Sequence, residues 1–186
     1  MKYFWMMLLS VMWVSPAWGM QVEGVKVADT VQLEGQNLHL NGAGMRTKFF
    51  FDIYVGALYT SQQASTFKDV IADRHAKRVT MYFVYDEVER DKLVGGWIAG
   101  FKKNQSKAEF KALDQRLQTF NTWFVDGHAG DTLSFDFLSD GKTTTSMNGQ
   151  LLGVIEGVDF QQALLAVWLG KKPADKDLKK AMLQTH

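Results

Sequence analysis

The segment 40–60, LNGAGMRTKFFFDIYVGALYT, constrains the fold more than any other part of the chain. Gly42 and Gly44 predict a tight turn ahead of a long strand that begins near Arg46. The odd positions of this strand are all apolar: Phe49, Phe51, Ile53, Val55, Ala57 and Tyr59. Because alternate side chains of a strand point to opposite faces, these residues predict one dry face. We therefore expect this segment to be the central strand of a sheet.

The even positions of the same strand suit a cleft or a wet surface better than a sealed core. They are Arg46, Lys48, Phe50, Asp52, Tyr54, Gly56 and Leu58. If no bulge intervenes, the polar members line up on one face at about 7 Å per two residues. Two interpretations stay open. The face is either a binding cleft, or a solvated surface on which Asp52 neutralises Lys48 and Arg46.

The N-terminus predicts a secretory signal peptide over residues 1–19. It has one lysine and an apolar run, 3–14, that is shorter than the ~20 residues needed to span a bilayer. Ala17 and Gly19 supply small residues at the −3 and −1 positions of a cleavage site. Cleavage there would leave residues 20–186, with no membrane span, in the periplasm of a Gram-negative cell. The alternative is an uncleaved membrane anchor, because Trp18 beside the site is bulky.

Length and composition limit what the rest of the chain can be. With 186 residues and 46% hydrophobic content, it is long enough for one domain with a core. A formal net charge of +1 argues against nucleic acid as a partner. There is no cysteine, and the four histidines fall in separate segments, so we expect no metal site and no cofactor.

Turn and helix signals give the order of the remaining elements. Strands are predicted at 22–40, around a turn at 34–37, at 78–85, and as a three-stranded meander over 132–155. Helices are predicted at 65–72, at 87–103 with Asp86 as its cap, from Ser106 to Phe124, at 159–170, and from Pro173 onward. Strands followed by helices, then a meander, then helices predict an α+β fold with an antiparallel sheet.

Two blocks of sequence resemble the chalcone isomerase family, in particular its bacterial secreted branch. The first is GAGMR at 42–46, followed by an aromatic-rich strand that ends in GALY. The second is GVDFQQALLAVWLGKKPADKDLKKAML at 157–183. The resemblance implies an open-faced sandwich, in which helices pack on one face of a large antiparallel sheet and a ligand cleft lies between the layers.

The resemblance implies a catalytic role only in part. In plant members, the arginine after GAG stabilises an anion, and a threonine, a tyrosine and an asparagine arrange water and polar contacts. Arg46 matches the arginine and is the candidate catalytic residue if the protein is an enzyme. Tyr54 or Leu58 stands in place of the threonine, and segment 90–97 has neither tyrosine nor asparagine.

Three functions therefore stay open. Non-catalytic members of the family bind fatty acids through an arginine and a tyrosine, which predicts Arg46 and Tyr54 as ligand-binding residues. Lys48 and Phe50, on the same face of the predicted strand, are the other two candidates. The ligand would be a small apolar or amphiphilic molecule with an anionic head. The second possibility is an isomerase, an intramolecular lyase in which Arg46 stabilises an oxyanion. The third is a structural or partner-binding protein.

Overall fold

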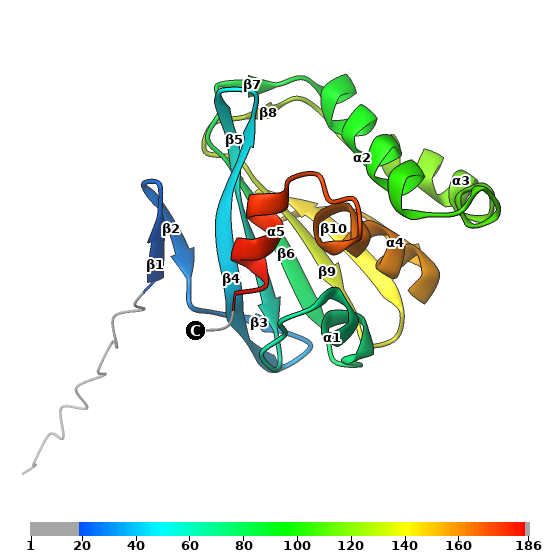
Figure 1. Cartoon of the computed structure of the whole chain (residues 1–186), viewed down its shortest axis with the longest axis horizontal. Helices are drawn as coiled ribbons and strands as arrows, with labels where there is room; N and C mark the ends of the chain where they lie inside the picture. The colour runs from blue at the N-terminus through cyan, green and yellow to red at the C-terminus, as the bar shows by residue number, and fades with distance from the viewer. Residues whose placement is uncertain (1–18, 185–186) are drawn as a thin grey trace, which may run out of the picture.

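The computed structural model describes residues 19–184, so the predicted signal peptide lies outside the described residues apart from Gly19. The main sheet has seven antiparallel strands in the order β11-β10-β9-β6-β5-β4-β3 (Figure 1). They are β3 (Thr30–Leu33), β4 (Gln36–Lys48), β5 (Phe51–Thr60), β6 (Lys77–Phe83), β9 (Thr132–Phe137), β10 (Lys142–Met147) and β11 (Gln150–Glu156). Two small ribbons pair β1 (Gly19–Val22) with β2 (Val25–Ala28) and β7 (Glu87–Val88) with β8 (Gly127–His128).

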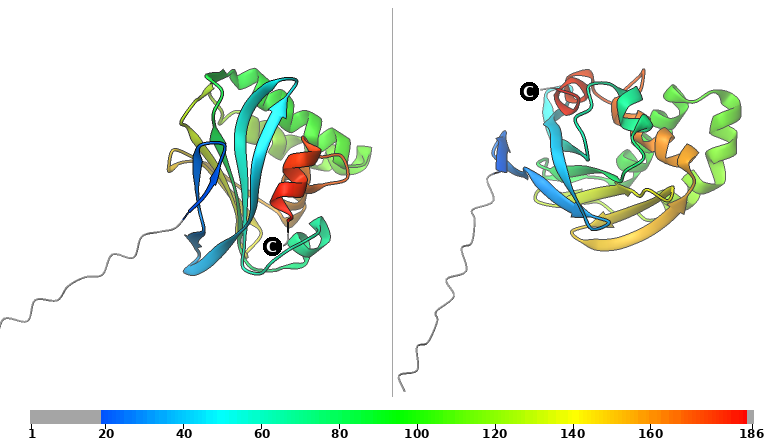
Figure 2. Two further views of the ribbon diagram at one scale, coloured as in Figure 1. Left: turned by 60° about the vertical axis from the view of Figure 1, so that its left-hand side comes forward. Right: turned by 90° about the horizontal axis from the view of Figure 1, so that it is seen from below.

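The helices lie on one side of the sheet, which curls around them (Figure 2). They are α1 (Phe67–Ala72), α2 (Arg90–Asn104), α3 (Lys107–Asn121), α4 (Val158–Leu169) and α5 (Lys176–Met182). The predicted capping box of α3 is confirmed, because Ser106 accepts from the N–H of Glu109 while Glu109 accepts from the N–H of Ser106. The predicted α+β fold, an antiparallel sheet with helices on one face, is confirmed.

Aromatic side chains fill the core between the sheet and the helices. Trp168 of α4 is 1% exposed, and its ring centroid lies 5.4 Å from Phe135 of β9 and 5.6 Å from Trp97 of α2. A second, smaller core lies on the other face of the sheet, where the β1–β2 ribbon packs with Val27 near Ala57 and Tyr59. From Tyr54 to Thr60, β5 is therefore buried on both faces, which corrects the expectation of a single dry face, while Phe49 and Phe51 of the expected dry face are exposed.

The segment 40–60 forms a hairpin rather than one long strand. Strand β4 runs to Lys48, the chain turns at Phe49 and Phe50, and β5 begins at Phe51. Gly42 and Gly44, predicted to form a turn, lie within β4. Each would place a Cβ against Ala181 of α5, so these glycines allow the helix to approach the sheet closely. The pairing also shifts register between Arg46 and Thr47, so a simple count of odd and even positions fails there.

Two helix starts differ from the prediction. Helix α2 begins at Arg90 after Glu89, not at Asp86, because residues 87 and 88 pair with β8 as a short strand. Helix α5 begins at Lys176, where the Asp175 carboxylate accepts from the N–H groups of Asp177 and Leu178, so Pro173 belongs to the preceding loop. Within residues 19–184, no helix is both long enough and apolar enough to cross a bilayer.

Candidate functional site

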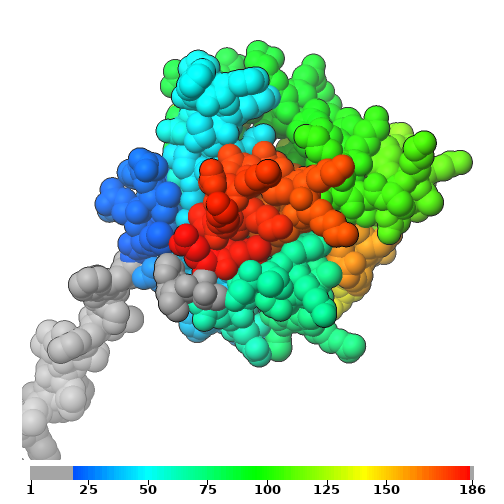
Figure 3. Space-filling model, in the orientation of Figure 1, coloured from blue at the N-terminus to red at the C-terminus, as the bar shows by residue number. Residues whose placement is uncertain are grey.

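A cavity of about 530 Å³ lies between the sheet and α2. Its walls come from β4, β5 and β6, from α2 and α4, and from the loop at 172–174 that joins α4 to α5. Figure 3 shows the surface hollowed between the cyan β4–β5 hairpin, the green α2 and the orange-red C-terminal part of the chain. The position between the two layers is the one expected from the family resemblance.

Arg46 and Tyr54 lie side by side in this cavity. They are register partners across β4 and β5, so their side chains share the helix-facing side of the sheet. The Arg46 guanidinium carbon lies 5.4 Å from the centroid of the Tyr54 ring, within the range of a cation–π contact. The Nε atom of Arg46 is buried and has no hydrogen-bond acceptor among the described residues. The hairpin therefore places a cationic donor beside an aromatic ring in the cavity wall.

Tyr54 is held in place from the opposite layer. Its hydroxyl oxygen accepts a hydrogen bond from Nε1 of Trp168, at 2.9 Å, and the side chain is 2% exposed. Burial raises the pKa of the Tyr54 phenol above its ordinary value, against the opposing effects of the Arg46 charge and the Trp168 hydrogen bond. The hydroxyl therefore keeps its proton near pH 7.

Helix α2 contributes a tryptophan and two glycines that our reading of the sequence did not assign to the site. Trp97 lines the cavity, and its Nε1 is buried without an acceptor among the described residues. Gly95 and Gly96 also line it, and a Cβ added at either would meet nothing within 4 Å. By contrast, a Cβ on Gly100 would lie 2.8 Å from Val167, so only Gly100 serves close packing. The sequence feature that could have indicated this part of the site is a pair of adjacent glycines inside a helix, because each glycine lowers helix stability.

The charged residues around the cavity are mostly cationic. Among the described residues that line it, the cations are Arg46, Lys48, Lys92, Lys103 and Lys172, and the one acid is Glu87. Lys92 is itself partly neutralised, because its Nζ lies 3.0 Å from a carboxylate oxygen of Glu89. The excess of positive charge favours a negatively charged group at the mouth.

The structure brings together three of the four predicted ligand-binding residues. Arg46, Lys48 and Tyr54 line the cavity. Phe50 does not line it, and is 96% exposed at the β4–β5 turn. Asp52 lies outside it as well, and accepts a hydrogen bond from Thr47 at 2.7 Å. The proposed neutralisation of Arg46 by Asp52 is therefore not seen.

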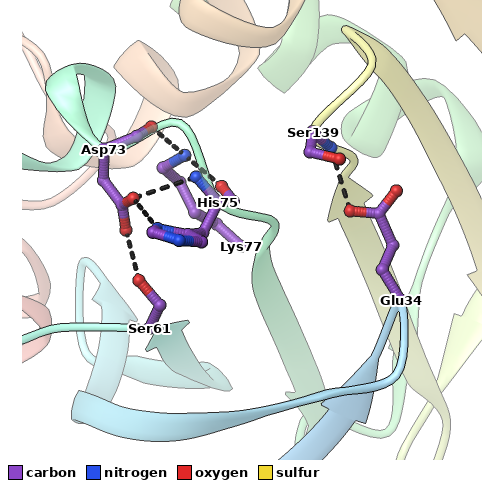
Figure 4. Close-up of polar contacts among 6 residues, drawn as sticks. All are labelled: Glu34, Ser61, Asp73, His75, Lys77 and Ser139. Carbon is purple, nitrogen blue, oxygen red and sulfur yellow. Dashed lines mark hydrogen bonds and ion pairs between the residues drawn. The ribbon is translucent and has the colours of Figure 1, made fainter.

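A second cavity, of about 460 Å³, lies near α1 beside a polar cluster that we define as Ser61, Asp73, His75 and Lys77 (Figure 4). The Asp73 carboxylate accepts from Ser61 Oγ at 2.8 Å and contacts His75 Nδ1 at 2.7 Å. Lys77 Nζ donates to the backbone carbonyls of Asp73 and His75 at 2.6 and 2.7 Å. Each side chain of the cluster therefore has a hydrogen-bond partner. Within residues 19–184, no group of three or more His, Cys, Asp or Glu residues could hold a metal ion.

The fold and the cavity define an open-faced α+β sandwich with a hollow between its two layers. A family model described as "Chalcone isomerase-like" matches residues 19–184, so the chain belongs to the chalcone isomerase-like family. Comparison with curated protein sequences found no match. Among solved structures, the chain is similar to a fatty-acid binding protein of Arabidopsis thaliana. The TM-score is 0.62 at 14% identity, covering 83% of this chain and 95% of that one. At this identity, the likeness concerns the fold alone.

Proposed function

We propose that the protein binds an apolar molecule with an anionic head, such as a fatty acid, in the cavity between the sheet and α2. The observation that carries this proposal is the Nε of Arg46, a buried cationic donor without an acceptor among the described residues. A buried donor that stays unpaired costs free energy, so such a group is expected to have a partner when the site is filled. A carboxylate is the acceptor that a guanidinium matches best.

The lining of the cavity suits both parts of such a ligand. Arg46 and Trp97 line the cavity, and their Nε and Nε1 atoms are donors without acceptors among the described residues, which favours a ligand that brings acceptors. Leu93, Met81 and Val167 provide an apolar wall for the rest of the molecule. The volume of about 530 Å³ falls within the range of about 300–1,000 Å³ typical of small-molecule sites. The structural neighbour that is named as a fatty-acid binding protein agrees with this ligand class.

Titration of the purified protein with a fluorescent long-chain fatty acid, below its micellar concentration, tests the proposal. We expect saturable binding that an unlabelled fatty acid displaces. The matched fatty alcohol has the same chain but no charge, so it should bind at least tenfold more weakly if Arg46 holds a carboxylate. Equal affinity for acid and alcohol would contradict the assigned head-group site.

The place of action in this proposal is the periplasm, and the family branch is the bacterial secreted one. Support comes from the N-terminal sequence, with its short apolar run and the Ala17-Trp18-Gly19 site. N-terminal sequencing of the protein from a periplasmic fraction should begin at Met20. Recovery of a chain that begins at Met1 from the membrane fraction would favour the uncleaved anchor instead.

A further inference from the structure

Three consecutive phenylalanines stand out in solvent at the β4–β5 turn. Phe49 is 84% exposed, Phe50 96% and Phe51 54%. We call these three residues the aromatic tip. Single exposed apolar residues are ordinary, but three adjacent rings at the end of a projecting hairpin mark an interaction site.

The backbone of the tip is also unfavourable for the residue it carries. Phe49 has a φ of 58°, in the left-handed region that favours glycine and asparagine. Glu23, Glu34 and Asn148 have similar φ values at other hairpin turns of the chain, but each is a polar residue followed by a glycine. Phe49 is a bulky aromatic residue followed by Phe50, so the aromatic tip departs from the turn chemistry used elsewhere in the chain.

The aromatic tip lies beside the mouth of the cavity. Phe51 packs against Tyr85 with ring centroids 5.5 Å apart, and Tyr85 lines the cavity. Lys48, which precedes the tip, also lines it, together with Lys92, Lys103 and Lys172. Exposed aromatic rings and a basic rim therefore lie next to each other at the cavity.

We infer that the aromatic tip docks the cavity mouth onto an anionic phospholipid membrane. Aromatic rings beside cationic side chains are the combination that binds membrane interfaces, with rings entering the acyl boundary and cations contacting the head groups. Area alone does not separate a membrane from a protein, because a stable protein interface buries about 800 Å² on each partner and three aromatic rings supply about 450–750 Å² at 150–250 Å² each. The basic rim beside the rings favours the anionic membrane, and a bilayer needs no shape-matched pocket. The docked state would open the cavity toward the lipid phase. That last step rests on the proposed function, whereas the membrane contact does not.

Vesicle co-sedimentation of the mature chain tests this inference. At low salt, the wild type should bind vesicles of phosphatidylcholine mixed with phosphatidylglycerol more tightly than vesicles of phosphatidylcholine alone. The double variant Phe49→Ser/Phe50→Ser should bind at least about tenfold more weakly, because two rings no longer leave water. The matched control is Leu151→Ser on β11, which removes a side chain that is 64% exposed outside the tip and should change nothing.

Three results would overturn the inference. They are a wild type that does not bind anionic vesicles, a double variant that binds like the wild type, and a concentration-dependent dimer that the double substitution abolishes. The last would assign the tip to self-association. Phe50→Ser alone repeats the test at a side chain that makes almost no contact with the fold.

The same variants separate this inference from the proposed function. Arg46→Ala should keep vesicle binding but lose affinity for monomeric fatty acid, whereas the tip variants should do the reverse. Vesicle binding without any fatty-acid binding would leave the membrane contact standing and remove the ligand proposal. Fatty-acid binding without vesicle binding would do the opposite.

Discussion

The two cavities between sheet and helices are similar in volume, at about 530 and 460 Å³, but differ in how their polar groups are satisfied. Beside the cavity near α1, the Asp73 carboxylate and the Lys77 ammonium group have partners in their own cluster. In the cavity beside α2, the Nε of Arg46 and the Nε1 of Trp97 are buried without acceptors among the described residues. The paired groups near α1 stabilise the fold, whereas under the proposed function the unpaired donors beside α2 bind a ligand. Volume alone would not distinguish the two.

The largest expected effect is loss of stability in the satisfied cluster. Asp73→Ala removes the acceptor of the Ser61 hydroxyl and of the His75 backbone N–H, at 2.8 and 2.9 Å. The side chain is only 16% exposed, so we expect a loss of about 2–3 kcal/mol of unfolding free energy. In a domain of this size, that lowers the melting temperature by roughly 4–12 °C. Thermal melts measure it, and fatty-acid affinity should stay at the wild-type level.

Arg46→Ala should show the opposite pattern. Loss of a charge-assisted bidentate contact should weaken binding of an anionic ligand by about 1.5–3 kcal/mol, or tenfold to over a hundredfold. Stability should change little, because the variant loses the cation–π contact with Tyr54 but also removes a buried donor, Nε, that has no acceptor among the described residues. Isothermal titration and thermal melts measure the two quantities.

Two further substitutions test the Arg46 result. Asp52→Asn is the matched control, since its carboxylate contacts Thr47 outside the cavity, and it should leave affinity unchanged. Arg46→Lys keeps the charge but loses the planar guanidinium, which makes bidentate hydrogen bonds. The affinity of this variant should therefore lie between those of the wild type and Arg46→Ala. Strong destabilisation by Arg46→Ala, with no stabilisation of the wild type by fatty acid, would show that Arg46 stabilises the fold rather than binding a ligand.

Much of the fold was predictable because local signals and global structure agree. The capping box at Ser106 and Glu109 and the hairpin turns of the 132–155 meander each depend on a few neighbouring residues. The turn at Phe49 and Phe50 was not predictable, since three phenylalanines favour a strand and carry no turn signal. Gly42 and Gly44 wrongly suggested a turn. Both glycines allow close packing against α5, and a contact between residues so far apart in the sequence cannot be predicted from a local pattern.

The site was predictable only where one strand pair builds it. Arg46 and Tyr54 were identified by resemblance, and the hairpin does bring them together, but through register pairing rather than through shared parity along one strand. Trp97 and the glycine pair on α2 reach the same cavity from a different layer. Convergence of that kind depends on how helix and sheet pack, which no local spacing encodes.

Substitution of a glycine in α2 is expected to raise the free energy of unfolding and to lower ligand affinity. Gly96→Leu should gain up to about 1 kcal/mol of stability from helix propensity, because a side chain there meets open space. The same side chain would occupy part of the cavity and weaken ligand binding. Gly96→Ala is the matched control, which should keep most of the stability gain with little loss of affinity. Affinity unaffected by Gly96→Leu would show that the ligand does not reach α2.

The smallest expected effect is on the pH dependence of stability. It should differ between Asp73, which is paired near α1, and Arg46, which lies in the cavity beside α2. Burial raises the pKa of Asp73, but hydrogen bonds from the His75 backbone, Ser61 and the His75 ring outweigh it, so the pKa lies below its ordinary value of 3.8. A carboxyl whose pKa is lower in the folded state stabilises the protein above the unfolded value. That contribution is lost as the pH falls from about 3.8 through the folded value.

Chemical denaturation from pH 6 down to pH 3 measures this contribution as the difference between wild type and Asp73→Asn. The difference should be constant in the upper part of the range and shrink below pH 4, because protonated aspartic acid and asparagine are both neutral. The difference between wild type and Arg46→Ala should not change over the same range, since Arg46 has no acidic partner among the described residues to protonate. If it changes in parallel with the Asp73 difference, Arg46 is paired with a carboxylate in solution, and the two regions do not differ in their charge pairing.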